Sequence, residues 1–115
     1  MLENHIENAA LERRFALFCD RLSLSECEVR SLTGSKASLA RRDVDPVHRE
    51  TCIRLLLELE PLLVELKGED EFPLWLRRDG FGQTPLAFLA TGPESIRGMI
   101  YATKSLLCQR KAFCA

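Results

Sequence analysis

The chain of 115 residues lacks the features that mark several large classes of protein. Its charged start, MLENHIENAALERR, contains no apolar core of a signal peptide, and no uncharged run is long and apolar enough to span a bilayer. The net charge is −1, so overall charge gives no reason to expect a nucleic acid or an anionic membrane as partner. These absences predict a cytoplasmic protein with no membrane partner.

Disulfide frameworks and β-strands are missing as well. The cysteines, five in all, are odd in number and show no Cys-x-x-Cys spacing, so we expect reduced thiols that serve mostly as small core residues. No segment alternates apolar and polar residues with a period of two, and no glycine-rich phosphate loop follows a strand. The sequence therefore argues against a disulfide scaffold and a nucleotide-binding unit, and it predicts no cofactor.

The chain does have helical periodicity almost everywhere. Apolar residues recur at helical spacing from Ile6 to Leu22 and again through the leucine-rich segment CIRLLLELEPLLVEL. A chain of this length can bury the core of one domain and is too short for two. We therefore predict one all-α domain over residues 1–115, a compact bundle of roughly six to eight short helices.

Residues that start and stop helices set the expected boundaries. Ser25 followed by Glu28 predicts a capping box, and Gly34 ends the helix that they start. Residues 35–42 are expected to form a short third helix. Within the leucine-rich segment, Pro61 should kink the central helix or break it in two.

The stretch WLRRDGFGQTPLAFLATG, residues 75–92, combines turn residues with large apolar side chains. Asp79-Gly80 predicts a turn, and Thr84-Pro85 caps and starts the next helix at once. We expect a compact helix-loop-helix with its leucines and Trp75 in the core. Because loops on rigid scaffolds often carry recognition, residues 77–83 are candidates for contact with a partner.

This stretch resembles the toxin-binding domain of the Xre/MbcA/ParS antitoxins. The shared order is Trp-Leu, a loop, aromatic-Gly-x-Thr-Pro-Leu, a further Leu, and Thr-Gly before an apolar helix. The preceding leucine-rich helix also fits the family, whereas the loop from Trp75 to Gly82 is shorter than usual. The residues that carry the resemblance are Trp75, Leu76, Phe81, Gly82, Thr84, Pro85, Leu86, Leu89, Gly92 and Ile96.

The resemblance implies a cytoplasmic antitoxin of a bacterial type II toxin–antitoxin pair. Its partner would be a RES-domain toxin that consumes NAD, and the antitoxin, itself no enzyme, would bind the toxin directly and obstruct the active-site cleft. Residues 46–115 would form the toxin-binding part, in a homodimer or a hetero-oligomer with the toxin. The expected toxin contacts are Trp75, Arg77, Arg78, Phe81, Gly82, Gln83, Thr84, Arg110, Lys111 and Phe113.

The tail, residues 110–115, mixes basic and apolar side chains. In the antitoxin interpretation it reaches into the substrate cleft of the toxin and stands in for substrate contacts. The alternative is a docked last helix with a frayed end.

Residues 1–45 are expected to be helical, with the outline of a degenerate helix-turn-helix. Arg30 stands where a small residue normally lets the two helices cross, and Asp43 and Asp45 add negative charge near the phosphates. The alternative to an antitoxin is still a DNA-binding regulator that represses its own operator without a toxin partner. The residues that would face DNA are Ser35, Lys36, Ser38, Arg41 and Arg42.

A catalytic or metal site and a bare oligomerisation module are the remaining alternatives. His48 and Cys52 lie one helical turn apart, a spacing that suits a metal or a Cys-His pair. A structural zinc site needs four ligands, however, and the other candidates are scattered, so we expect a histidine beside a buried thiol. The leucine-rich helix could instead serve a subunit interface, which a concentration-dependent oligomer would reveal.

Overall fold

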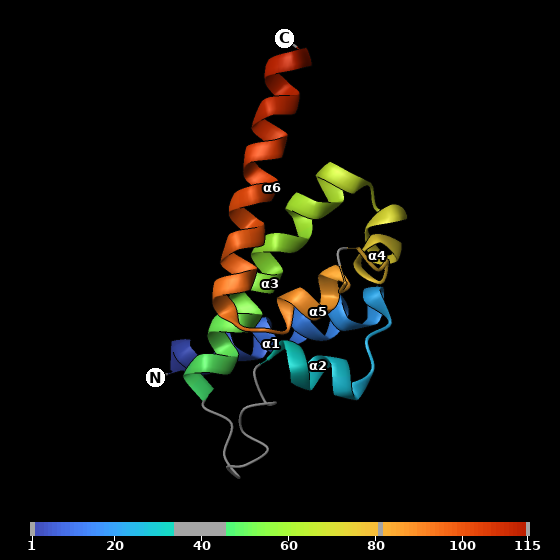
Figure 1. Ribbon diagram of the computed structural model, residues 1–115. Coiled ribbons are helices and arrows are strands. Elements are labelled where there is room, and N and C mark those ends of the chain that lie inside the picture. The colour runs from blue at the N-terminus through green and yellow to red at the C-terminus, as the bar shows by residue number, and fades with distance from the viewer. Residues whose placement is uncertain (1, 34–45, 81, 115) are drawn as a thin grey trace.

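The computed structural model describes residues 2–33, 46–80 and 82–114, and within these ranges the chain forms six helices and no strand (Figure 1). The prediction of an all-α fold is confirmed. Three helices, with 21 or 22 residues each, are longer than the short helices expected. The helices are α1 (Leu2–Leu22), α2 (Glu26–Leu32), α3 (Pro46–Lys67), α4 (Glu71–Leu76), α5 (Pro85–Leu89) and α6 (Pro93–Cys114).

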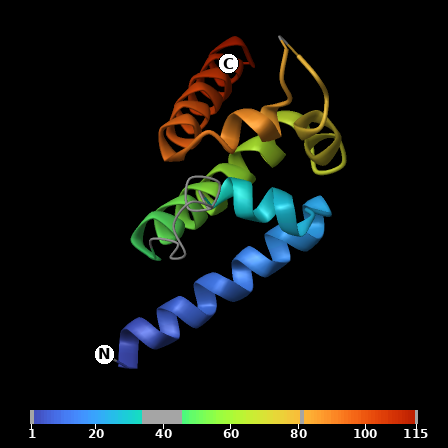
Figure 2. The same cartoon turned by 60° about the horizontal axis from the view of Figure 1, so that its bottom comes forward.

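The helix α3 is the one around which the others are arranged. Helices α1, α4 and α6 all pack against it, and Figures 1 and 2 show α1 and α6 on different sides of it. The leucine-rich segment is therefore core, as apolar residues on nearly every face of one helix require. The buried cluster consists of Leu11, Phe15, Phe18, Leu22, Leu32, Cys52, Ile53, Leu56, Leu57, Leu59, Leu63, Phe72, Leu76, Leu86, Leu89, Ile96 and Ile100.

Pro61 does not break this central helix. The helix α3 continues through Pro61 without interruption. Proline has no N–H to donate to the carbonyl of Leu57, but Leu59 and Leu63 beside it are only 2% and 1% exposed. Burial of these side chains outweighs the loss of one hydrogen bond, and this is why the break, one of the two outcomes expected at Pro61, is absent.

Two helix starts follow the capping chemistry expected from the sequence. Ser25 Oγ accepts a hydrogen bond from the Glu28 N–H at 3.1 Å, and the Glu28 carboxylate accepts one from the Ser25 N–H at 2.8 Å. Thr84 Oγ accepts from the Ala87 N–H at 3.1 Å, with Pro85 as the first residue of α5. The capping box and the Thr-Pro start are both confirmed.

The two ends of the chain project from the core. The C-terminal half of α6 extends beyond the rest of the molecule in Figure 1, and the first turns of α1 extend beyond α3 in Figure 2. None of the helices in the described ranges combines the length and the apolar character needed to cross a bilayer. The third helix expected at residues 35–42 lies outside the described residues.

Replacing Leu63 by alanine should lower the free energy of unfolding by about 2–5 kcal/mol, because it empties a core site. The Leu63 side chain is 1% exposed, whereas Leu74 is 60% exposed. Leu74→Ala therefore removes the same atoms at the surface and should change stability by less than about 0.5 kcal/mol. Urea unfolding followed by circular dichroism measures both variants, and equal losses would contradict the arrangement of α3 and α4.

Candidate partner-binding surface

A tight turn joins α4 to α5. The Gly80 N–H donates to the Gln83 carbonyl at 3.0 Å, and the Gln83 N–H donates to the Gly80 carbonyl at 3.2 Å. Gly82 has a φ of +88°, a left-handed conformation that side chains rarely adopt. The turn thus depends on glycine at this position, and it brings the chain from the end of α4 directly to the start of α5.

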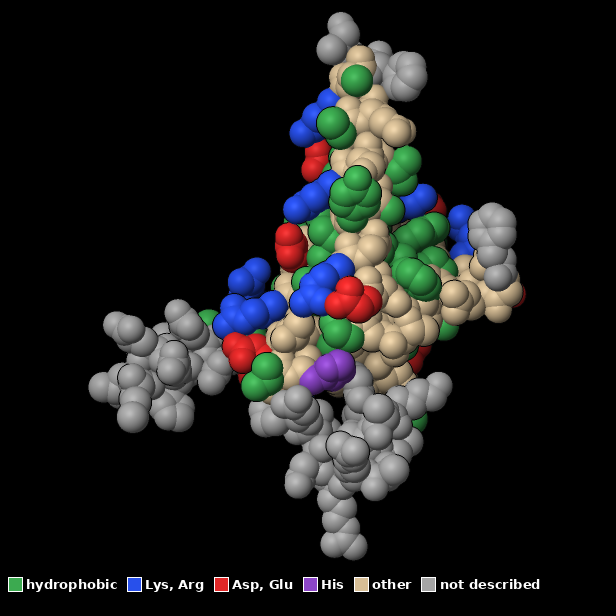
Figure 3. Space-filling view, turned by 60° about the vertical axis from the view of Figure 1, so that its left-hand side comes forward, with side chains coloured by type: hydrophobic (Ala, Val, Ile, Leu, Met, Phe, Trp, Pro, Cys, Tyr) green, Lys and Arg blue, Asp and Glu red, His purple; other side chains and the backbone are tan. Residues whose placement is uncertain are grey.

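Beside this turn the surface is hollowed between α4, α5 and α6. The α4–α6 hollow has a volume of about 350 Å³, within the usual range for binding sites. Figure 3 shows hydrophobic side chains gathered along and beside α6, the tall column of that view. The apolar walls of the hollow are Trp75, Pro85, Phe88 and Met99, and its rim is Arg78, Asp79, Gly80, Gln83 and Thr84.

Trp75 connects the core to this hollow. Its side chain is half-buried against the core and also forms part of the hollow's wall. Lys67 Nζ lies 5.0 Å from the centre of the tryptophan ring, close enough for a cation–π interaction. The sequence interpretation placed Trp75 in the core and also among the toxin contacts; in the structure it lies at the edge of the core and forms part of the wall of the hollow.

Arg77 is partly exposed but is engaged by partners within the chain. Its guanidinium donates to the carbonyls of Leu22 at 3.2 Å and Ser23 at 3.0 Å, and to the two carboxylate oxygens of Glu28 at 2.6 and 3.0 Å. The hydrogen bonds from Arg77 lower the pKa of Glu28, and those same bonds raise the pKa of Arg77. This Arg77 clamp caps the end of α1 and ties it, with the first turn of α2, to the end of α4.

Arg110 is also engaged within the chain. Its guanidinium donates to the carbonyls of Glu65 and Leu66, each at 3.3 Å, and so caps the last turn of α3. Lys111 is exposed and forms no hydrogen bond or ion pair within the described part of the chain. The side chain of Phe113 lies outside the described residues. Of the basic residues expected to contact a toxin, Arg77 and Arg110 thus have internal partners.

The other expected contact residues fall into two groups. Arg78, Gln83 and Thr84 line the α4–α6 hollow together with Trp75, and Gly82 is exposed in the turn beside it. Phe81 lies outside the described residues. So do the residues expected to face DNA, which are Ser35, Lys36, Ser38, Arg41 and Arg42.

Three residues of this surface were not among the expected partner contacts. They are Phe88 and Met99 in the walls and Lys67 over the Trp75 ring. Phe88 lies one helical turn after Thr84, so helical spacing could have suggested it. Met99 and Lys67 come from other helices, and no local pattern in the sequence brings them to Trp75.

His48 and Cys52 are neighbours in the structure, as their spacing suggested. The Cys52 Sγ lies 3.8 Å from His48 Nε2, and Cys52 is fully buried. Burial raises the pKa of the Cys52 thiol, which therefore stays protonated at neutral pH and is a poor nucleophile. Among the described residues, no group of three or more His, Cys, Asp and Glu side chains is placed to hold a metal ion.

Comparison of the chain with protein-family models, with curated proteins and with solved structures found no match. Function therefore has to be inferred from the α4–α6 hollow and from the motif residues around it.

Loss of the Arg77 clamp should destabilise the protein. In Arg77→Ala the carbonyls of Leu22 and Ser23 lose a donor and Glu28 loses its partner, so we expect the free energy of unfolding to fall by about 1–2 kcal/mol. Arg78→Ala removes the same group at a position without an ion pair to any described residue, and should cost less than about 0.5 kcal/mol. Equal melting temperatures for the two variants would argue against the clamp.

The pH dependence of stability tests whether the Glu28 carboxylate contributes to the Arg77 clamp. Arg77 lowers the pKa of Glu28 in the folded state, so the stabilisation is present above the unfolded pKa of glutamate and is lost as pH falls through the folded value. The stability difference between the wild type and Arg77→Ala should therefore shrink below about pH 4. A constant difference would mean that the carbonyl contacts alone account for it.

Proposed function

We propose that this chain is the antitoxin of a bacterial type II toxin–antitoxin pair and neutralises a RES-domain, NAD-consuming toxin by direct binding. The observation that carries the proposal is the α4–α6 hollow, which gathers Trp75, Thr84 and Pro85 of the antitoxin-like motif on one surface. The class of toxin comes from the motif resemblance alone. In this function the chain is a cytoplasmic binding protein that performs no catalysis.

The composition of the hollow supports recognition of a protein. Trp75, Phe88 and Met99 provide apolar surface, and Arg78 stands at the rim without an ion pair to any described residue. Aromatic, methionine and arginine side chains are enriched in the buried centres of protein interfaces. The hollow suits a toxin segment with an apolar anchor and a carboxylate that can pair with Arg78.

The anchoring of the hollow supports direct docking. The Arg77 clamp holds the residue just before the loop, the paired Gly80 and Gln83 close the turn, and the Thr84 cap starts α5. A surface that is already ordered loses less conformational entropy on binding. This favours recognition by a surface that the described residues of α4, α5 and the turn already form.

The position of α6 supports obstruction of the active site. The helix extends beyond the rest of the molecule (Figure 1), and Arg110 ties its last turns to the end of α3. Lys111 lies in the last turn of α6, which is part of the projecting end. We propose that this end enters the toxin's cleft while the hollow holds the toxin's surface, in a hetero-oligomer of the two proteins.

Co-expression with the neighbouring open reading frame tests the proposal. The neighbour alone should stop growth and deplete NAD, and this chain should restore growth and co-purify with it. Arg78→Glu reverses a charge at the rim of the hollow and should weaken the complex by at least about tenfold. Arg13→Glu makes the same change on the exposed surface of α1 and should rescue like the wild type. A harmless neighbour, or full affinity in Arg78→Glu, would sink the proposal.

Two tail variants separate folding from obstruction. Deletion of residues 111–115 keeps the Arg110 cap on α3, so we expect an unchanged melting temperature together with loss of neutralisation. Arg110→Ala keeps the tail and removes the cap that positions it, so it should lose about 0.5–1.5 kcal/mol of stability and should neutralise less well than the wild type but better than the deletion. If the shortened chain protects cells, the tail does not obstruct the active site.

A further inference from the structure

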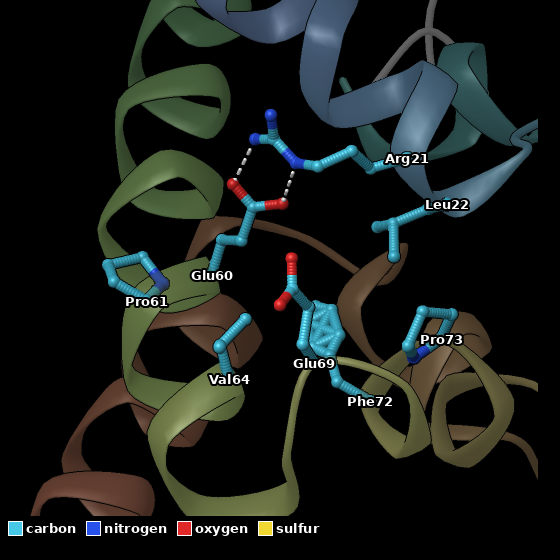
Figure 4. Close-up of a pocket in the computed structure, with 8 residues that line it drawn as sticks. All are labelled: Arg21, Leu22, Glu60, Pro61, Val64, Glu69, Phe72 and Pro73. Carbon is cyan, nitrogen blue, oxygen red and sulfur yellow. Dashed lines mark hydrogen bonds and ion pairs between the residues drawn. The ribbon is translucent and has the colours of Figure 1, made fainter.

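A second pocket lies between the end of α1, the second half of α3 and the start of α4 (Figure 4). We name it the Glu69 pocket, and its volume is about 520 Å³. Its apolar walls are Leu22, Pro61, Val64, Phe72 and Pro73, and its charged groups are Arg21, Glu60 and Glu69. The proposed function makes no use of this pocket.

The Glu69 pocket contains two carboxylates, those of Glu60 and Glu69, but only one cationic group, the guanidinium of Arg21. Arg21 Nε donates to one carboxylate oxygen of Glu60 at 2.9 Å, and a second guanidinium N–H donates to the other oxygen, which makes a forked ion pair. Glu69 forms no hydrogen bond or ion pair with any residue in the described part of the chain. In Figure 4 its carboxylate points toward Glu60 and Arg21. Two carboxylates therefore meet one guanidinium, and the carboxylate of Glu69 is left without a cation.

The raised pKa of Arg21 agrees with this arrangement. The hydrogen bond to Glu60 raises the pKa of Arg21 most, and the charge of Glu69 adds to it from a greater distance. Arg21 is thus committed to Glu60, and its forked edge is not available to an incoming anion. A cationic ligand can therefore pair with Glu69, whose side chain is exposed.

We infer that the Glu69 pocket binds the long basic side chain, lysine or arginine, of a partner protein. Such a side chain has an aliphatic stem that suits the walls formed by Val64 and Phe72, and a cation that suits Glu69. An anionic ligand would meet two carboxylates, and a wholly apolar ligand would desolvate Glu69 without giving it a partner.

The size of the pocket favours a protein segment over a free amine. A volume of about 520 Å³ is more than one side chain fills, so the backbone and the neighbouring residues of the segment have room beside the basic group. The site is separate from the α4–α6 hollow, so this inference stands or falls independently of the antitoxin proposal.

Titration of the full chain with Nα-acetyl-lysine methylamide, followed by amide NMR shifts, tests the inference. We expect saturable shifts at residues 69–72 that weaken as salt is raised. The Nε-acetylated form of the probe keeps the stem without the charge, and should bind about three- to fivefold more weakly, as fits an exposed ion pair. 1,5-Diaminopentane, a free amine, should bind no more tightly than the lysine probe.

Glu69→Gln should weaken binding of the charged probe by the same factor of about three to five. Glu71→Gln is the matched control, because Glu71 is also exposed and lies two residues away in the sequence but does not line the pocket. Equal binding of the two lysine probes, unchanged binding in Glu69→Gln or the absence of shifts would overturn the inference. Tighter binding of diaminopentane would also overturn it, in favour of a small amine.

Discussion

Burial of α3 is the constraint on which the rest of the structure depends. Ile53, Leu56 and Leu63 are at most 1% exposed, and α1, α4 and α6 all pack against this one helix. The apolar stripes of the surrounding helices therefore gain most of their hydrophobic stabilisation from a shared neighbour. The same burial lets α3 run through Pro61, because the packed leucines on either side hold the helix where its own hydrogen bonding is incomplete.

Two arginines connect the packed helices to the surface features that are proposed to bind a partner. Arg77 and Arg110 both donate to carbonyls at helix ends, groups that have no partner inside their own helix. Arg77 sets where the loop toward Thr84 begins, and Arg110 ties the projecting end of α6 to the end of α3. Each contact is partly exposed and modest in energy, but together they position the hollow and the tail on which the proposed binding depends.

The sequence predicted the features that local patterns determine, such as the helical content, the Ser25 capping box and the Thr84 cap. It could not predict contacts between distant residues. Arg77 looked like a free cation because its partner carbonyl, that of Leu22, lies 55 positions earlier, and Arg110 looked free because its partners lie 44 and 45 positions earlier. The walls of the hollow come from three helices, so only the contribution of residues 75–88 could be foreseen from local sequence patterns.

The most direct test of the hollow as a docking surface uses Trp75, the single tryptophan of the chain. Biosynthetic replacement by 5-fluorotryptophan gives one ¹⁹F NMR signal from the wall of the hollow, with no contribution from an unlabelled partner. We expect this signal to shift, and to lose its response to a paramagnetic agent in the solvent, when the purified product of the neighbouring open reading frame binds. A stable complex in which the signal and its solvent response stay unchanged would show that the partner docks elsewhere.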